Sequence, residues 1–319
     1  MRAKALAEPT NPQPTMATLR GLMIAAMVAP ILCGRAASAG FAGRAPRGMH
    51  AGGETPSRHV GYTVRMIQQA GTSAAAKPRP HRGFTAFPLK VLAIAGMTCN
   101  HACYIYWDYL PPKILCALFA LGGLTFPIMA FLLVEGYRHT SSVRRYGRRL
   151  LVFALVAQVP YGLFLAHEMN VLFTLFVCLC LLYAYDHMQR RGLFWLTFAL
   201  VTALTAFCDW GILAPCMVLT LHVVKDRRQR VAYSALLPIA TGGLPALMQF
   251  MELPTPQNLA FALYPLVGCS ATIPLLWAYN GGRGRSMKWF FYAYYPAHIA
   301  VLGLAKGLLL GDWNIAMTG

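Results

Sequence analysis

The sequence predicts an all-α membrane protein, a polytopic bundle of about nine transmembrane helices. The 319 residues are 57% hydrophobic and only 12% charged, a balance that a soluble domain of this length would not keep in solution. Beyond residue 86 the apolar runs are roughly twenty residues long and do not alternate, which favours helices over barrel strands. Most basic residues in this part fall between the runs.

Residues 1–86 differ from the rest of the chain. They are rich in Gly, Ala, Arg and Pro and nearly lack acidic and aromatic residues, which predicts a disordered extension ahead of a transmembrane domain over 87–319. The apolar run Gly21–Gly34, followed by a small-residue motif, is typical of a signal peptide. Cleavage there would invert the first span relative to the basic loops behind it. We therefore expect a cytoplasmic extension, or a translation start at Met49 or Met66.

Nine apolar segments follow the extension. Each is a candidate transmembrane helix, and the fifth and sixth are short, so the boundary between those two is the weakest in the series. The segments are 87–109, 114–137, 149–167, 170–187, 193–208, 210–224, 231–251, 258–278 and 289–310.

The basic residues indicate an orientation. Lys and Arg cluster after the second, fourth, sixth and eighth segments, whereas the alternate connections contain Lys113 and essentially no other basic residue. By the positive-inside rule, we expect a bacterial inner-membrane protein with its basic loops in the cytoplasm and its C-terminus in the periplasm. The formal charge of +18 is then a topology signal, and no nucleic-acid partner is expected.

Two histidines lie inside apolar segments. His101 is eleven residues beyond Lys90 and His298 is ten beyond Lys288, so both lie about 15 Å along their helices, near mid-membrane. A buried neutral histidine can accept a proton from a nucleophile, which makes either one a candidate base. Each residue is also compatible with a structural role, and Asn100 is a hydrogen-bonding neighbour of His101.

Aromatic residues surround the second histidine. Tyr294 and Tyr295 precede His298 by four and three residues, so either can share its helix face. Pro296 frees a backbone carbonyl and can kink the helix there. Tyr294, Tyr295 and Asn100 are candidates for stabilising an oxyanion.

A second cluster ends the second segment. Glu135 and His139 are four residues apart, so Glu135 can orient His139 or act as a base itself. The alternative is an ion pair between Glu135 and Arg138 that only ends the helix. The arginines that follow can bind the phosphates of a nucleotide-type cofactor, contact anionic lipid or set topology. They are Arg144, Arg145, Arg148 and Arg149.

Other polar residues carry weaker signals. Asn170 and Thr174 can bond to neighbouring helices without any chemistry. The cysteines lack the paired spacing of a zinc or redox site, so we expect no metal. The chain has no phosphate-binding glycine loop, dinucleotide fingerprint or nucleophile elbow. It also lacks repeated halves with paired broken helices, which argues against a transporter.

Five stretches, taken together and in order, resemble the TraX family of conjugative-transfer proteins, including its TrbP-type members. The resemblance extends over nearly all of residues 88–310. The stretches are LKVLAIAGMTCNH at Leu89–His101, FPIMAFLLVEGYRHT at Phe126–Thr140, RYGRRLLVFALVAQVPYGL at Arg145–Leu163, NVLFTLF at Asn170–Phe176 and FYAYYPAHIAVL at Phe291–Leu302.

The resemblance implies an integral-membrane acetyltransferase that modifies the N-terminal amine of pilin during conjugative pilus biogenesis. Acetyl-CoA is the donor that it implies, and pilin, membrane lipids and other conjugative-transfer proteins are the partners. Many relatives carry Asp where this sequence has Asn100. The family positions most plausible as functional are His101, Glu135, Arg138, His139, Arg149, Asn170 and His298.

Two other functions stay open from the sequence. One is a non-catalytic assembly factor that binds the hydrophobic pilin subunit between its helices. The other is a membrane acyltransferase for a different cell-surface acceptor, since the chain is also distantly similar to the acyltransferases that modify surface glycans. Which histidine is the base is likewise left open.

Overall fold

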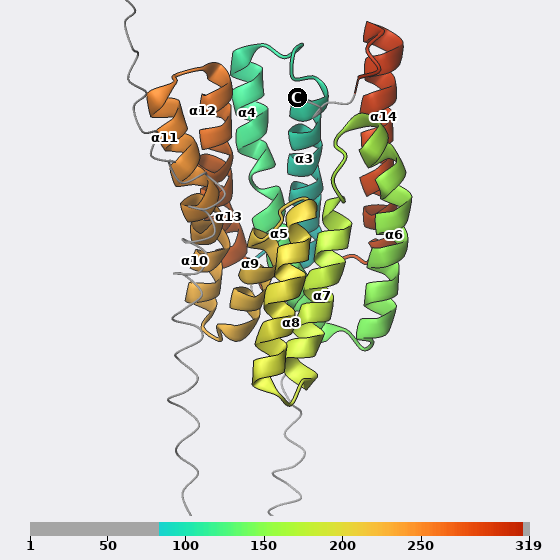
Figure 1. Cartoon of the computed structure of the whole chain (residues 1–319), viewed down its shortest axis with the longest axis vertical. Helices are drawn as coiled ribbons and strands as arrows, with labels where there is room; N and C mark the ends of the chain where they lie inside the picture. The colour runs from blue at the N-terminus through green and yellow to red at the C-terminus, as the bar shows by residue number, and fades with distance from the viewer. Residues whose placement is uncertain (1–82, 315–319) are drawn as a thin grey trace, which may run out of the picture.

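The computed structural model describes residues 83–314 (Figure 1). In this part of the chain the regular secondary structure is helical, with two isolated β-bridges and no strand. The predicted all-α fold is confirmed. The elements are α3 (Ala86–Ile105), α4 (Pro112–Gly122), α5 (Thr125–His139), α6 (Val143–Phe164), α7 (Val171–His187), α8 (Arg191–Leu204), η1 (Thr205–Phe207), α9 (Leu213–Val223), α10 (Arg227–Pro238), η2 (Ile239–Gly243), α11 (Leu244–Glu252), α12 (Pro256–Leu263), η3 (Tyr264–Cys269), α13 (Ser270–Trp277) and α14 (Lys288–Leu310).

Four helical segments are long and apolar enough to cross a membrane, so the chain is a membrane protein. The predicted count of nine spans is not confirmed. α3 and α6 have the length, with 20 and 22 residues, but Lys90, the Asn100–His101 pair and the arginines of α6 lower their hydropathy. The four segments are Pro112–His139, Arg227–Glu252, Pro256–Trp277 and Lys288–Leu310.

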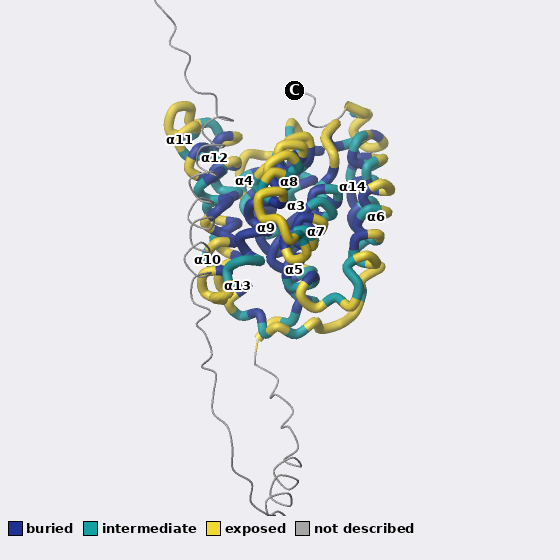
Figure 2. Tube along the Cα trace, turned by 60° about the horizontal axis from the view of Figure 1, so that its bottom comes forward, coloured by how far each residue is buried: buried dark blue, intermediate teal, exposed yellow. Residues whose placement is uncertain are grey.

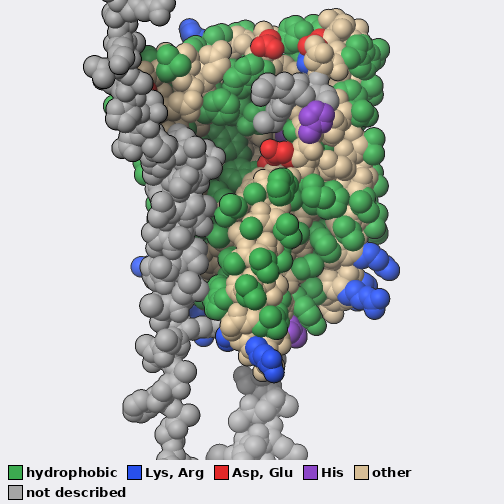
Figure 3. All heavy atoms as spheres, viewed as in Figure 1, with side chains coloured by type: hydrophobic (Ala, Val, Ile, Leu, Met, Phe, Trp, Pro, Cys, Tyr) green, Lys and Arg blue, Asp and Glu red, His purple; other side chains and the backbone are tan. Residues whose placement is uncertain are grey.

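The helices α7, α8 and α9 are shorter than a bilayer is thick. They have 17, 14 and 11 residues, so α9 rises only about 16 Å, half of the hydrocarbon core. Figure 1 shows these three in the lower half of the bundle, while α3, α4, α12 and α14 continue to the upper end. The connection between α8 and α9 therefore turns at mid-height, below an apolar hollow visible in Figure 3.

Several helices begin at side chains that cap the backbone. The Ser142 hydroxyl accepts a hydrogen bond from the backbone N–H of Arg145, and the Asp226 carboxylate accepts one from that of Gln229. Such residues satisfy N–H groups that the first turn of a helix leaves without a partner. Each of these two caps comes directly before an arginine-rich stretch, and both stretches lie at the lower end of the bundle.

The α4–α5 break packs directly against η3. A Cβ atom on Gly268 would lie 2.2 Å from the carbonyl oxygen of Ala120 and 2.6 Å from the Cα of Gly123, so no side chain fits between the two backbones. η3 is a π-helical segment, a distortion that often marks functional sites. Its first residue, Tyr264, is placed by this crossing and lines the central cavity.

The core runs along the bundle axis, and the outer helix faces carry exposed apolar side chains (Figure 2). Phe126, Ile128 and Phe131 of α5 are almost fully buried, whereas Val159 of α6 and Val301 of α14 are more than 60% exposed. An outward-facing apolar surface suits lipid contact. α5 is thus the central helix around which the others pack.

Residues 83–86 belong to the folded part. The backbone N–H of Phe84 donates to the carbonyl of Ala278, and Ala86 donates to Gly282. Ala86 is already the first residue of α3. The rest of the predicted extension, with its signal-like run and both alternative start methionines, lies outside the described residues.

Candidate functional site

His101 and His298 meet at the centre of the bundle, although 197 positions separate them. The Nδ1 atom of His101 lies 2.7 Å from the Nε2 atom of His298, and both residues are buried, at 4% and 6% exposed. Their rings are stacked 4.9 Å apart. The two candidates predicted separately from depth therefore form one unit.

A backbone carbonyl sets the direction of this pair. The Nδ1 atom of His298 lies 2.9 Å from the carbonyl oxygen of Tyr294, which can only accept a hydrogen bond. In a neutral pair His298 therefore donates from Nδ1, and its Nε2 accepts from Nδ1–H of His101. The Nε2 atom of His101 is left with a free lone pair, as a base requires.

A cavity of about 680 Å³ extends from His101 to the lower end of the bundle. Apolar side chains such as Met97, Met129 and Leu132 line its middle, and Glu135 and His139 lie near its mouth. Its basic residues come from the first two turns of α3, α6 and α14 and from the connection before α14. They are Lys90, Arg145, Arg149, Arg283 and Lys288.

A smaller pocket of about 230 Å³ meets the large cavity at His101. The two share Asn100, His101, Asp209, Trp210 and Tyr264 as lining residues. The smaller pocket is also lined by Glu168, and no Lys or Arg among the described residues lines it. His101 thus lies at the junction between a basic cavity and an acidic pocket. We call the large one the inner cavity and the small one the outer pocket, after the orientation expected from the basic loops.

Asp209 is the site residue that the sequence analysis missed. It belongs to the loop between α8 and α9. The backbone N–H of Asp209 donates to the carbonyl of Met169, and the backbone carbonyl of Asp209 accepts from the hydroxyl of Thr174. Trp210 has a left-handed backbone, with a φ of 65°, and stacks on Phe126 at 3.9 Å. Non-glycine residues are held in this conformation only where their surroundings enforce it.

Glu135 forms ion pairs at the lower end of the bundle. Its Oε1 atom lies 2.6 Å from Nη2 of Arg230 and 3.6 Å from Nη1 of Arg138, and Oε2 lies 3.7 Å from His139. Arg138 also donates to the backbone carbonyl of His222. The predicted pairing of Glu135 with Arg138 and His139 is present, and Arg230 is the closer partner of Glu135.

The arginines of α6 separate into two groups. Arg145 and Arg149 line the cavity, whereas Arg144 and Arg148 do not. The buried Nε atom of Arg149 has no hydrogen-bond partner in residues 83–314. A buried donor without a partner is costly, so Arg149 is suited to an anionic ligand.

Asn170 and Tyr294 have structural partners. The side chain of Asn170 is fully buried, caps α7 at the N–H of Leu172, and donates to Ala154 and Gln158. The hydroxyl of Tyr294 lies 2.8 Å from that of Thr98. Neither residue lines the cavities, whereas Tyr295 and Asn100 do.

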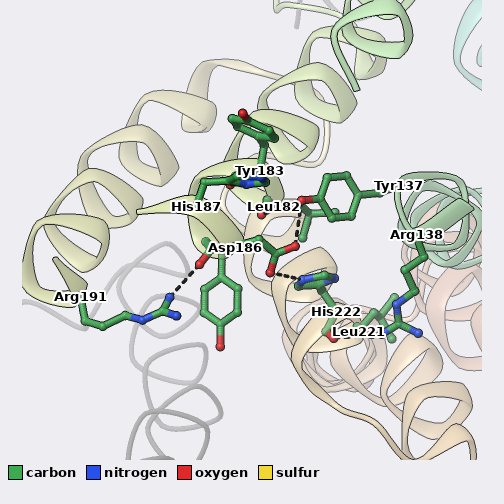
Figure 4. A network of polar contacts seen from close by, with 10 residues as sticks. Tyr137, Arg138, Leu182, Tyr183, Asp186, His187, Arg191, Leu221 and His222 are labelled. Carbon is green, nitrogen blue, oxygen red and sulfur yellow. Dashed lines mark hydrogen bonds and ion pairs between the residues drawn. The ribbon is translucent and has the colours of Figure 1, made fainter. Parts of the chain in front are cut away.

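A polar network joins the lower ends of three helices (Figure 4). Asp186 of α7 accepts a hydrogen bond from the hydroxyl of Tyr137 of α5 at 2.8 Å. The same carboxylate contacts Nε2 of His222, on α9, at 3.0 Å. These contacts hold the lower ends of α5, α7 and α9 together.

Comparison with known proteins identifies the relatives of this chain. It is 33% identical over 245 residues to a protein of Dichelobacter nodosus named "Probable fimbrial assembly protein FimC, serogroup H1", and the alignment covers 71% of this chain and 97% of that protein. No solved structure matches. The sequence profile described as "TraX protein" matches residues 87–306, a range that includes both histidines and Asp209. The chain belongs to the TraX family.

Proposed function

We propose that this protein transfers an acetyl group from acetyl-CoA to the N-terminal amine of pilin during pilus biogenesis. Its family and its similarity to a fimbrial assembly protein support a role in pilus assembly. The transfer reaction is a further step, and it rests on the arrangement of side chains at the junction of the two cavities.

The histidine pair is the observation that carries this proposal. A chain of hydrogen bonds from the Tyr294 carbonyl through His298 leaves Nε2 of His101 unprotonated. His298 acts as the positioning residue, since it fixes the tautomer and ring orientation of His101. A base held in this way contributes about 10²- to 10⁴-fold to the rate of a proton transfer.

The inner cavity suits the donor. Acetyl-CoA carries several phosphate charges, and five Lys and Arg side chains line the mouth, where arginine can bind phosphate bidentately. The apolar middle of the cavity matches the neutral arm that carries the thioester. With this mouth in the cytoplasm, as the basic loops predict, the acetyl group reaches His101 from the side where acetyl-CoA is made.

The reaction is an acyl transfer to nitrogen. The amine attacks the thioester carbonyl, His101 Nε2 takes a proton from the attacking nitrogen, and the C–S bond breaks. The departing thiolate receives that proton from His101. Tyr295 lines the cavity beside the histidines, and in the proposed reaction it stabilises the oxyanion between these steps.

Intact-mass measurement of the partner pilin tests this function. Pilin produced with the intact protein should carry one acetyl group, and His101→Ala should lower the acetylated fraction by about 10²-fold or more. His187→Ala is the matched control, because His187 is exposed at the end of α7 and lines neither cavity. It should leave acetylation intact.

The same experiment distinguishes a non-catalytic assembly factor. That role predicts an unmodified pilin N-terminus in the presence of the intact protein, and pilus assembly that survives His101→Ala. Full acetylation in both His101→Ala and His298→Ala would overturn the role proposed for the pair.

A further inference from the structure

We propose that Asp209 binds the acceptor as an ammonium ion and removes its first proton before His101 removes the second. This inference rests on the proposed function and specifies the form in which the acceptor is recognised. It assigns a catalytic role to a residue in the loop between α8 and α9, within the outer pocket.

An amine acceptor that binds as its ammonium ion needs two proton acceptors in the site. An α-amino group has a pKa of about 8, so near pH 7 most acceptor molecules are ammonium ions without a free lone pair. One proton must leave before attack, and a second leaves the nitrogen as the amide forms. His101 returns its proton to the thiolate, so the first proton needs another group.

The balance of the whole step is consistent with this division. An ammonium ion and acetyl-CoA give an amide, CoA with a free thiol and one released proton. The C–S bond breaks and a C–N bond forms. In the proposed path the released proton is the one that Asp209 takes, and it leaves through the outer pocket, away from the donor. A hydroxyl acceptor would release no such proton and would need only His101.

The junction presents hydrogen-bond acceptors that fit an ammonium group. Asp209 contributes a carboxylate, Asn100 a buried Oδ1 atom that has no partner among residues 83–314, and His101 its free Nε2. An ammonium group has three N–H donors. All three residues line both cavities, so an acceptor entering from the outer pocket meets them together.

No Lys or Arg side chain among residues 83–314 forms an ion pair with Asp209. None of the ion pairs in this part of the chain involves Glu168 either. A carboxylate taken out of water without a cation is costly, and a bound ammonium would offset that cost. Besides Glu168 and the neighbouring Cys208, the titratable groups that face Asp209 from the elements packed around it are His101, Tyr104, Tyr161, Tyr264 and Tyr295.

The loop is built to hold this carboxylate still. The hydrogen bonds with Met169 and Thr174 fix the backbone of Asp209 on one side. On the other side, stacking of Trp210 on Phe126 offsets the cost of the left-handed backbone conformation of Trp210. A carboxylate needed only for loop structure would not require a position at the junction of two cavities.

The test compares the pH profile of Asp209→Asn with that of the wild type. Purified full-length protein is assayed with acetyl-CoA and a synthetic peptide of the mature pilin N-terminus between pH 6 and 9.5. We expect kcat/KM of Asp209→Asn to fall about tenfold for each pH unit below the pKa of the amine and to approach the wild-type value above it. Asp108→Asn, an exposed acid that lines neither cavity, should keep the wild-type profile.

A second acceptor separates catalysis from folding. A peptide whose N-terminal amine is replaced by a hydrazide is uncharged at neutral pH, and Asp209→Asn should acetylate it within about threefold of the wild type. In the wild type, KM for the amine peptide should increase as the pH rises above the pKa of the amine, whereas KM for the hydrazide peptide should not change with pH. This last measurement needs no variant.

The outcomes are distinct. A loss in Asp209→Asn that is equal at every pH and for both peptides, or no loss at all, overturns the role of Asp209 while the acetyltransferase function stands. A wild-type KM that does not follow the charge of the amine also overturns it. A wild-type protein that acetylates neither peptide overturns the proposed function itself.

Discussion

The two ends of the central cavity differ in charge and in construction. The inner mouth is lined by five Lys and Arg side chains from the starts of helices and one loop. Blocks of basic residues in the sequence predict it directly. The outer pocket has two acids, Glu168 and Asp209, on two short loops that meet at the Met169–Cys208 bridge. The basic mouth can therefore be predicted from the amino-acid composition of the loops. The acidic pocket cannot, because it depends on how deep in the bundle two short loops turn.

The wall common to both ends gives the largest expected effect. Gly268→Val would place a side chain against the carbonyl of Ala120, where no space exists, and should prevent the α4–α5 break from packing on η3. We expect loss of folded protein by size-exclusion chromatography in detergent, with both cavities lost together. Gly162→Val is the control, because a Cβ atom there meets nothing within 4 Å. Equal thermal stability of the two variants would contradict the close crossing.

The inner mouth gives the next largest effect. Replacing Arg145 and Arg149 together with Gln should raise KM for acetyl-CoA about 100-fold or more, because two charge-assisted hydrogen bonds of about 1.5 kcal/mol each contribute about 3 kcal/mol together. KM for the peptide should stay unchanged. Arg148→Gln removes a charge from the same helix outside the cavity and should have little effect. An equal rise in both variants would mean that net charge, and not this mouth, binds the donor.

The outer pocket gives the smallest of the three effects. Glu168→Gln should raise KM for the pilin peptide by about twofold to threefold, since partly exposed ion pairs contribute only about 0.2–1 kcal/mol. KM for acetyl-CoA should not change, which is the reverse of the arginine result. Steady-state kinetics with each substrate varied in turn measures both. A change in KM for acetyl-CoA alone would contradict the assignment of the two ends.

The sequence predicted the helices well and placed the two histidines at matching depth, because both depend on local patterns. Segment boundaries followed apolar runs, and equal distances from Lys90 and Lys288 placed His101 and His298 at matching depth. The predicted number of nine spans is not confirmed, because an apolar run does not by itself give a helix the length to span a bilayer. The 11 residues of α9 cannot cross a bilayer, although they are apolar.

The surroundings of Asp209 and Asn170 could not be predicted from the sequence. Asp209 separates the two shortest apolar segments, so its position in the sequence indicates only a boundary between helices. The shortness of those segments was the available signal, because two half-length helices must turn within the bundle. Asn170 was a candidate binding residue, yet its amide is occupied by α6 and α7. Which bonds a side chain already makes cannot be read from its position in a run.

The network of Tyr137, Asp186 and His222 sets the height of the site from its far end. A helix as short as α9 has no second polar end at the opposite membrane surface to keep it from sliding along the bundle axis. Its lower end is tied to α5 and α7 through Asp186. Since α9 is a rigid rod, that tie determines how far up its other end carries Trp210 and Asp209. The vertical alignment of Asp209 with His101 is thus maintained by residues that touch neither.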